Sequence, residues 1–479
     1  MEKNIRRLRE LPISEYQKRF FFEWVLAPDA VTYNVSYLHK IIGGLDEKAL
    51  RKACEMFISQ NEVVQVRFSE DGEICYHGEF TIDDFYLEAL FNPGIPLEQQ
   101  VGKFLYCPFD LTKGPILKLC LMKSLDRGKP EFYFFFVTHH IICDAVFISQ
   151  LYGQIQQAYN ALSVGSKNLP NVPKTFSLAV QAECKVLNKQ YKLKARKFWL
   201  DFIGDIPLTT ALPYQTNSLD HSNTLGEFIY FDLSSEESEK VRNYAKAKGT
   251  TVFVVLSSFY GLVLSKYISQ DFFFLNYSVM TRPDEFLEVA GCFMNNVPMK
   301  FELREVDMLD ELINQINQQR KSVKPFQRYT LGDIVQDQRL LAGKTANIVN
   351  IGFAQSYLNV IPFELQGLTT QPVDITWSTN SIYEIGMLYD ERSDVLRFKL
   401  EYRKTFFDGD LIRQLIRSFV KIIQGAVGGD KIQIKSYTVL PEETYSRLVY
   451  DWNATDREYE RSATICELFE RQVERTPDG

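Results

Sequence analysis

The stretch EFYFFFVTHHIICDAVFISQLYGQIQQAYNAL, residues 131–162, contains the most informative change of pattern in the chain. Residues 131–137 are strongly apolar and aromatic, which predicts a buried β-strand. After Asp144 the apolar side chains recur at the spacing of an amphipathic helix: Phe147, Ile148, Leu151, Tyr152, Ile155, Ala158, Tyr159 and Leu162. A strand that leads directly into a helix is a unit of an α/β fold.

Two adjacent histidines and an aspartate, His139, His140 and Asp144, occupy the junction between this strand and this helix. A turn at a sheet edge can hold a side chain rigidly toward a cavity, and an imidazole can act there as a base or hydrogen-bond partner near neutral pH. Adjacent side chains usually point apart, so we expect one ring to face a substrate and the other to face inward. The alternative is that both rings are hydrogen-bonded core groups; the spacing and setting favour the functional interpretation.

The composition is that of a soluble globular protein. The chain has 479 residues, enough for about three domains of roughly 150 residues each. Hydrophobic residues make up 45% and charged residues 24%, which excludes disordered and fibrous classes. The formal net charge of -7 argues against nucleic acid as the main partner, because phosphate binding needs a basic surface. Acidic carrier proteins stay possible partners, since a local basic patch can exist on an acidic protein.

The cysteines and the termini indicate the compartment. Eight cysteines are scattered without a CxxC pair, so we expect reduced thiols and neither a zinc site nor a disulfide framework. The N-terminus lacks the apolar region of a signal peptide, and no apolar run reaches the roughly 18 residues that a membrane span needs. We therefore expect a cytoplasmic protein that does not enter a membrane.

The order of elements predicts two similar halves. A connector rich in Gly, Ser, Asn and Pro at residues 165–174 predicts a boundary between them. Before it, residues 33–42 read as a strand and residues 47–59 as a capped helix. After it, residues 226–233 read as a strand, and a second capped helix extends to about residue 248. A pseudo-repeat of two α/β lobes follows from this order.

From about residue 441 the chain becomes polar and charged. It ends soon after a helix-like stretch whose apolar residues Ile465, Leu468, Phe469 and Val473 need a partner surface. We expect this tail to be the opening of another domain that has been cut off.

These features together resemble the condensation domains of nonribosomal peptide synthetases, a family marked by the motif HHxxxDG. The opening residues Ser14, Gln17, Arg19 and Phe22, the stretch PFDLTKGPILK at residues 108–118, and residues 281–300 and 400–408 resemble further segments of the family. Between residues 452 and 478, the letters WNAT, LFERQV and TPD resemble the linker and first residues of an adenylation domain.

The resemblance implies an α/β (α+β) fold with two chloramphenicol-acetyltransferase-like lobes in a V-shaped pseudo-dimer around a central tunnel. We assign residues 1–170 to the N-terminal lobe and 171–440 to the C-terminal lobe. Residues 441–479 would be the linker and the truncated start of the adenylation domain.

The resemblance also implies the reaction and the partners. A donor and an acceptor peptidyl carrier protein would insert phosphopantetheine arms, and the acceptor amine would attack the donor thioester to give an amide. No cofactor or metal bound by the chain itself is expected, and we expect a monomer joined to its adenylation domain. Tethering two reactants in a tunnel makes their encounter effectively intramolecular.

Carried over by position, the family motifs imply roles for individual residues. His140 would be the active-site imidazole, and it either removes the amine proton or orients the amine and stabilises the tetrahedral species. His139 would be structural, and Asp144 would point away from the substrate in an ion pair with Arg282. The alternative interpretation of Arg282 is a surface arginine at a strand end.

Ala145, Asn295 and Ser381 would line the tunnel or bind substrate; the alternative interpretation of Asn295 is a turn-forming residue. The chain departs from the family pattern at Ala145, which replaces the glycine of the motif, and at Glu384, where aspartate is usual. It also departs at Gln60, Asn61 and Gln65, which replace basic residues or histidine.

Three alternatives to a peptide-bond-forming enzyme share part of this pattern. A non-catalytic recruitment or gatekeeping module would keep the fold, and Ala145 is the feature that supports it. An epimerase of the same superfamily usually ends a module, whereas an adenylation start follows here. A free-standing acyl-CoA-dependent transferase would share HxxxD but would not account for residues 452–478. The subtype, joining two L-residues or starting a line with a fatty acyl donor, stays open.

Overall fold

A computed structural model describes residues 10–124, 130–166, 175–214, 224–268, 270–342, 349–356, 362–373, 381–440, 445–456, 458 and 462–477. The chain divides into two compact units, Met1–Ser436 and Tyr437–Gly479. Most of the expected connector, residues 167–174, lies outside the described residues. The boundary near residue 170 between two lobes therefore stays a prediction.

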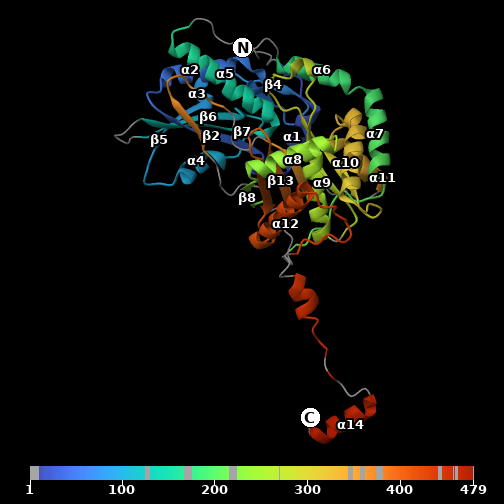
Figure 1. The fold of residues 1–479 in the computed structure, drawn as a ribbon. Coiled ribbons are helices and arrows are strands. Elements are labelled where there is room, and N and C mark those ends of the chain that lie inside the picture. Colours follow the sequence, from blue (N-terminus) through green and yellow to red (C-terminus); the bar gives the residue numbers. More distant parts are fainter. Residues whose placement is uncertain are drawn as a thin grey trace. The chain divides into compact units, whose positions relative to one another are not determined.

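The first sheet of the larger unit has the strand order β12-β2-β7-β6-β5. Its neighbours are antiparallel except for β5 and β6, which are parallel. Helices α2 and α5 lie over it (Figure 1). The Phe57 ring of α2 packs against the Phe147 ring of α5, and the Tyr152 ring of α5 packs against Phe136 of the sheet. The elements are β2 (Asn34–Ile42), β5 (Tyr86–Phe91), β6 (Leu117–Ser124), β7 (Glu131–His139), β12 (Thr369–Val373), α2 (Glu47–Gln60) and α5 (Ala145–Ser163).

The predicted strand and helix at residues 131–162 are confirmed. Strand β7 is buried along nearly its whole length, so side chains on both of its faces are covered. It continues two residues further than predicted, to His139, and α5 begins one residue after Asp144. The motif therefore lies between the last residue of a central strand and the first turn of a long helix.

Strand β12 was not anticipated from the sequence. It comes from the C-terminal half of the chain, yet it pairs with β2 at the edge of the first sheet, with Thr370 opposite Ile41. Just before it, the Phe363 ring packs against Phe134 and Tyr152 in the core. Its sequence TTQPV has no run of apolar residues, because an edge strand is largely exposed.

The second sheet has six strands in the order β10-β9-β11-β13-β14-β8, and β11 is parallel to both of its neighbours. Helix α9 is buried all round, and its Phe253 packs against Tyr277 of the sheet, while Phe419 of α12 packs against Phe398. The elements are β8 (Gly226–Asp232), β9 (Phe272–Met280), β10 (Met294–Glu302), β11 (Ile351–Gln355), β13 (Ile385–Asp390), β14 (Arg397–Arg403), α8 (Ser235–Ala247), α9 (Val252–Ile268) and α12 (Gly409–Gly428).

The predicted capped helices of both halves are confirmed. Asp46 caps α2 by accepting a hydrogen bond from the Ala49 amide, and Ser234 and Glu237 form the capping box of α8. The remaining elements are a small sheet of β1 (Glu10–Leu11), β4 (Cys75–His77) and β3 (Val66–Phe68), the helices α1 (Glu15–Leu26), α3 (Ile82–Phe85), α4 (Leu97–Leu105), α6 (Phe176–Val186), α7 (Lys189–Ile203), α10 (Leu309–Val323) and α11 (Leu331–Ala342), and the short turns η1 (Glu62–Gln65), η2 (His140–Ile142), η3 (Asp284–Phe286) and η4 (Lys324–Phe326).

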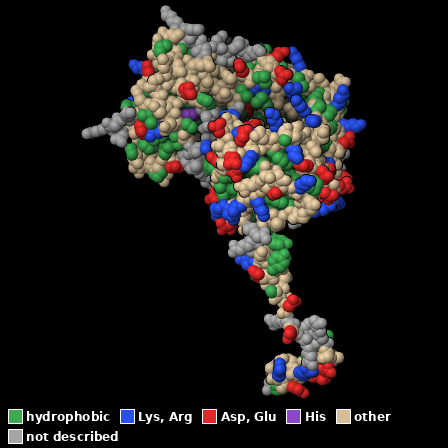
Figure 2. All heavy atoms as spheres, in the orientation of Figure 1, with side chains coloured by type: hydrophobic (Ala, Val, Ile, Leu, Met, Phe, Trp, Pro, Cys, Tyr) green, Lys and Arg blue, Asp and Glu red, His purple; other side chains and the backbone are tan. Residues whose placement is uncertain are grey.

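Within the described part of the chain, no single helix is both long and apolar enough to cross a membrane. Helices α8 and α9 reach that length and composition only as a pair, and they are bent by 102° at their junction. On the face shown in Figure 2, basic and acidic side chains are interspersed.

The smaller unit contains the π-helical turn η5 (Arg447–Asp451) and helix α14 (Ile465–Arg475). Helix α14 begins with a capping box of Thr464 and Glu467. The amphipathic helix expected in the tail is therefore present, and its apolar side chains are exposed: Ile465 (85%), Leu468 (45%), Phe469 (68%) and Val473 (45%).

Two glycines of the second sheet make room for an aromatic ring. Gly352 of β11 pairs with Gly386 of β13, and the Tyr383 ring lies against them. A Cβ added at Gly352 would lie 2.3 Å from Cδ2 of Tyr383, which is closer than any real contact. Here glycine is required for close approach rather than for an unusual φ.

We expect Gly352→Ala to lower the free energy of unfolding by about 1–3 kcal/mol, because the ring must shift. Gly153→Ala is the matched control: it lies in the middle of α5, and nothing lies within 4 Å of the added Cβ. The control should raise stability by about 0.5–1 kcal/mol, since alanine is the better helix former. Urea unfolding of both variants measures this, and equal effects at the two positions would contradict the packing argument.

Candidate active site

The motif residues are held by the backbone on both sides of His140. The His140 amide donates to the Tyr33 carbonyl at 2.8 Å, and its carbonyl accepts from the Cys143 amide at 3.1 Å. The bond from Cys143 closes the short turn η2, which joins β7 to the helix start, and the bond to Tyr33 ties that turn to the segment before β2. The turn therefore presents His140 at a fixed place.

His139 is an internal capping group. Its ring is buried, and Nδ1 accepts a hydrogen bond from the Ile141 amide at 3.1 Å, so the neutral ring carries its proton on Nε2. Burial, and secondarily the neighbouring His140, lower the pKa of His139 to about 3. His139 is thus a neutral structural side chain near neutral pH.

The His140 ring is partly exposed and stacks on Phe20 of α1, with centroids 5.1 Å apart and planes 13° from parallel. Its Nδ1 is buried and has no hydrogen-bond partner among the described residues. Burial lowers the pKa of His140, and the Asp144 carboxylate opposes this only in part. The ring is therefore a neutral imidazole that can accept a proton or a hydrogen bond.

Asp144 is fully engaged away from the imidazole. Its carboxylate accepts from the Phe147 amide at 3.0 Å, which caps α5, and from the Phe293 amide at 3.0 Å. Arg282 donates to both carboxylate oxygens, at 2.8 and 2.7 Å. The structure thus brings together the two residues expected to form an ion pair.

Arg282 is equally constrained. Its side chain is completely buried and donates to the carbonyls of Val289 at 2.8 Å and Gly291 at 3.2 Å. The guanidinium also lies 4.7 Å from the centre of the Phe293 ring. Asp144 and Arg282 therefore connect the start of α5 to the segment between β9 and β10.

The other three expected site residues make no hydrogen bond to His140. Ala145 is the first residue of α5 and is partly exposed, in a helical conformation that alanine adopts without strain. Ser381 is buried and donates to the Tyr383 carbonyl at 2.6 Å. The role of these residues in binding substrate stays a prediction.

Both polar atoms of the Asn295 side chain form hydrogen bonds to backbone groups of residues 327–331. Asn295 lies within β10, so the turn-forming alternative is wrong. Its Nδ2 donates to the carbonyls of Gln327 and Tyr329, and its Oδ1 accepts from the Leu331 amide. Asn295 thus holds the approach to α11, and its expected contribution to the tunnel floor stays a prediction.

Two departures from the family pattern are accommodated in the structure. Glu384 is buried and accepts hydrogen bonds from the Tyr214 hydroxyl at 2.7 Å and from Asn350 at 2.6 Å. Asn61 donates to the Phe57 carbonyl and to Gln154 of α5. Both side chains therefore satisfy buried polar groups.

A cluster of charged and aromatic residues beside His140 was not identified from the sequence alone. Arg19 and Glu23 form an ion pair at 2.9 Å on one face of α1, and the Tyr33 hydroxyl donates to Glu23. Their charged side chains retain 21% and 26% exposure, and Arg19 contributes to the lowered pKa of His140. The four-residue spacing of Arg19 and Glu23 was the available signal, but it is common on any helix surface.

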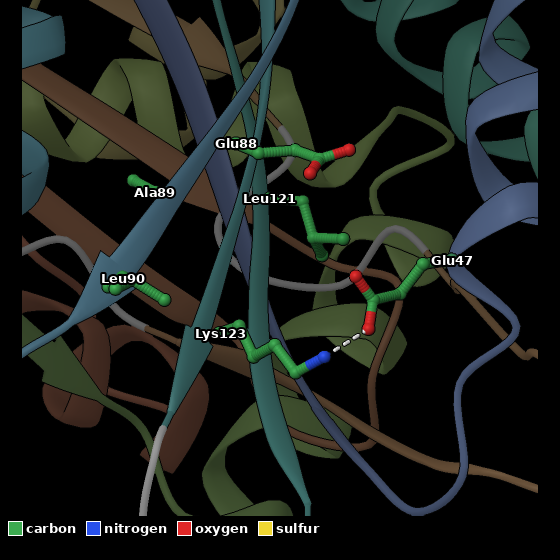
Figure 3. A pocket seen from close by; sticks show the side chains of 6 residues that line it. All are labelled: Glu47, Glu88, Ala89, Leu90, Leu121 and Lys123. Carbon is green, nitrogen blue, oxygen red and sulfur yellow. Dashed lines mark hydrogen bonds and ion pairs between the residues drawn. The ribbon is translucent and has the colours of Figure 1, made fainter.

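A separate surface pocket of about 200 Å³ lies on the first sheet, away from the histidines. Figure 3 shows its lining: Glu47 at the start of α2, Glu88, Ala89 and Leu90 of β5, and Leu121 and Lys123 of β6. Lys123 and Glu47 form an ion pair across it. Among the residues that the structure describes, no three His, Cys, Asp or Glu side chains are grouped to hold a metal ion.

We expect Asp144→Ala to lower the free energy of unfolding by about 3–5 kcal/mol, because it leaves the Arg282 charge buried without a partner. Asp232→Ala is the control, since it breaks an ion pair with Arg397 whose side chains are 40% and 34% exposed. Exposed pairs contribute less than about 1 kcal/mol. Chemical unfolding of both variants checks the difference, and similar losses would refute a special role for the buried pair.

The titration of His140 tests its environment. We expect its midpoint to lie below the usual 6.5, because burial disfavours the charged ring. The resulting contribution to stability is present above pH 6.5 and is lost as the pH falls. NMR of isotope-labelled histidine, assigned by the signal lost in His140→Ala, gives the midpoint; a value at or above 6.5 would contradict the structure.

Comparison with known proteins identifies relatives along most of the chain. A family model described as Condensation domain matches residues 7–449. Gramicidin S synthase 2 of Aneurinibacillus migulanus is 26% identical over 477 residues, which are 98% of this chain and 10% of that protein. Bacitracin synthase 1 of Bacillus licheniformis is 25% identical over 477 residues, 97% of this chain and 9% of that protein. The chain thus spans about a tenth of the length of these curated relatives.

Solved structures share the fold. The X-domain from teicoplanin biosynthesis superposes with a TM-score of 0.79 at 15% identity, covering 91% of this chain and 99% of that one. The first condensation domain of the CDA synthetase gives 0.71 at 15% identity, with 90% and 100% covered. These likenesses confirm the mixed α/β, chloramphenicol-acetyltransferase-like architecture. With a family match over residues 7–449 and the histidine motif between β7 and α5, the chain belongs to the condensation-domain family of nonribosomal peptide synthetases.

Proposed function

We propose that this chain joins an aminoacyl group and an acyl or peptidyl group, each carried as a thioester on a peptidyl carrier protein, with His140 at the reacting centre. The acceptor amine forms a bond to the donor carbonyl carbon, and the carbon–sulfur bond breaks. The amine loses one proton and the departing sulfur gains one, so the products are an amide and a free thiol. The phosphopantetheine arms belong to the carrier proteins.

The observation that carries this proposal is the state of His140. Of the three motif side chains, His139 is buried and Asp144 is saturated with hydrogen bonds, whereas His140 is partly exposed and neutral. A neutral imidazole can accept a hydrogen bond from the attacking amine. Burial lowers its pKa, so the ring is neutral near neutral pH and either removes the amine proton or orients the amine.

We further propose an arrangement of lobes, an adjoining domain, a cellular compartment and an oligomeric state for this reaction. Two lobes in a V with a central tunnel would admit the carrier arms from opposite faces. The segment from residue 441 would be the linker and start of an adenylation domain, whose body would cover the exposed apolar face of α14. All eight cysteines are free, which supports a reducing cytoplasm, and we expect the chain to act as a monomer.

A second candidate is a non-catalytic recruitment module. The teicoplanin X-domain shares this fold and has been solved in complex with OxyB, and Ala145 in place of glycine is the sequence feature in favour. If the chain is such a module, its His140→Ala variant would still bind the partner protein.

We expect His140→Ala to reduce the rate of amide formation by at least about 100-fold, since a positioned general base or orienting group contributes about 10²–10⁴. Donor and acceptor carrier proteins are loaded, the full chain is added, and the amide is followed by mass spectrometry. His77→Ala, on strand β4, is the control and should keep the wild-type rate.

Equal rates for wild type and His140→Ala would refute the catalytic role of His140. Absence of product from wild type with its native carriers, together with retained binding of a partner protein, would favour the recruitment module.

A further inference from the structure

Gln17 connects helix α1 to the histidine turn. Its side chain is completely buried, and its Nε2 donates to the Ile141 carbonyl at 3.0 Å. Its Oε1 accepts from the Ser14 amide at 3.0 Å, closing the capping box at the start of α1. One amide group therefore joins the first turn of α1 to the residue that follows His140.

The same helix supplies the platform under the imidazole. Phe20 lies three residues after Gln17, so the two side chains share a face of α1. Phe20 stacks on His140 and meets His139 edge-on. A shift of α1 along its axis would therefore move the turn and the platform together.

Glu183 of α6 holds the first turn of α1 from the other side. It is 2% exposed, and its carboxylate accepts from the Ser14 hydroxyl at 2.8 and 3.1 Å and from the Glu15 amide at 2.9 Å. The nearby charges are Glu15 and Lys192 of α7, which pair with each other at 3.3 Å. Glu183 thus anchors the one end of α1 that Gln17 also holds.

We infer that Glu183 and Gln17 are positioning residues that set the placement of the His140 ring through α1. This inference rests on the proposed function, because the placement matters for rate only if His140 contacts the reacting amine. Apolar contacts of Phe20 and Phe21 bury α1, but they are non-directional and tolerate sliding. The hydrogen bonds of Ser14, Gln17 and Glu183 are directional and fix the first turn of α1 beside the histidine turn. Tyr16 and Trp24 also donate from α1, to the carbonyls of Arg328 and Phe109, and neither of these bonds reaches the histidine turn.

Four variants test the inference. Gln17→Met keeps the shape and removes both hydrogen bonds, whereas Gln17→Glu keeps the acceptor for Ser14 and removes the donor to Ile141. Glu183→Leu removes the anchor, and Glu183→Gln keeps an acceptor of the same shape. Glu236→Leu, an exposed acid-to-leucine change in the first turn of α8, is the matched control.

We expect Gln17→Met, Gln17→Glu and Glu183→Leu to lower kcat by about 10–100-fold, since small misplacements of a catalytic group cost on that order. KM for either carrier should stay within about twofold, because α1 is displaced without loss of a docking surface. Glu183→Gln should recover kcat to within about threefold of wild type. NMR of labelled histidine should show the His140 signal, which senses the Phe20 ring, moved in the three impaired variants only.

An unchanged His140 signal in folded Gln17→Met and Gln17→Glu would overturn the inference, as would unchanged kcat with raised KM. If Glu183→Leu does not fold, the two Gln17 variants decide. If wild type forms no amide, the proposed function fails, but the NMR signal still shows whether α1 places the ring.

Discussion

The buried ion pair between Asp144 and Arg282 is the interaction on which the site depends. Moving either charge out of water costs several kcal/mol, and attraction between the two repays this only when every remaining polar group is satisfied. Asp144 meets this condition with the amides of Phe147 and Phe293 in addition to Arg282. Arg282 meets it in part: its two terminal nitrogens donate to Asp144 and to backbone carbonyls, while its buried Nε has no partner among the described residues. The capped end of α5 is therefore bound to the segment between β9 and β10, and the turn η2 is fixed between β7 and α5.

The same arrangement separates the roles of the two histidines. Burial lowers the pKa of both rings, but His139 accepts a backbone hydrogen bond at Nδ1, whereas the buried Nδ1 of His140 has no hydrogen-bond partner among the described residues. Arg19 adds a positive charge near His140 and reinforces the neutral form. The site thus combines a backbone held by hydrogen bonds with an imidazole that is neutral near neutral pH. Such an imidazole would hold a proton only briefly during a reaction.

The elements around the motif could be predicted because their causes are local. The apolar run of β7, the helical spacing of α5 and the capping residues Asp46 and Ser234 act over a few neighbours in the chain. Strand β12 could not be predicted, because its partner β2 lies in a distant part of the sequence and its exposed residues carry no strand pattern. The hydrogen bonds from the Asn295 side chain to the backbone of residues 327–331 could not be predicted for the same reason, since the fold brings these residues together.

By itself the sequence determined the chemical groups of this protein, HHxxxD at a strand-to-helix junction, and the α/β class, because periodicity and motif spacing are properties of neighbouring residues. Only the tertiary structure decided which of those groups is free to react. The deciding contacts are between residues far apart in the chain. Arg282 pairs with Asp144, and Phe20 stacks on His140. Gln17 bonds to the histidine turn, and Glu183 bonds to the first turn of α1. Burial and hydrogen-bond partners depend on these long-range contacts, and they determine the pKa and the accessibility of each group.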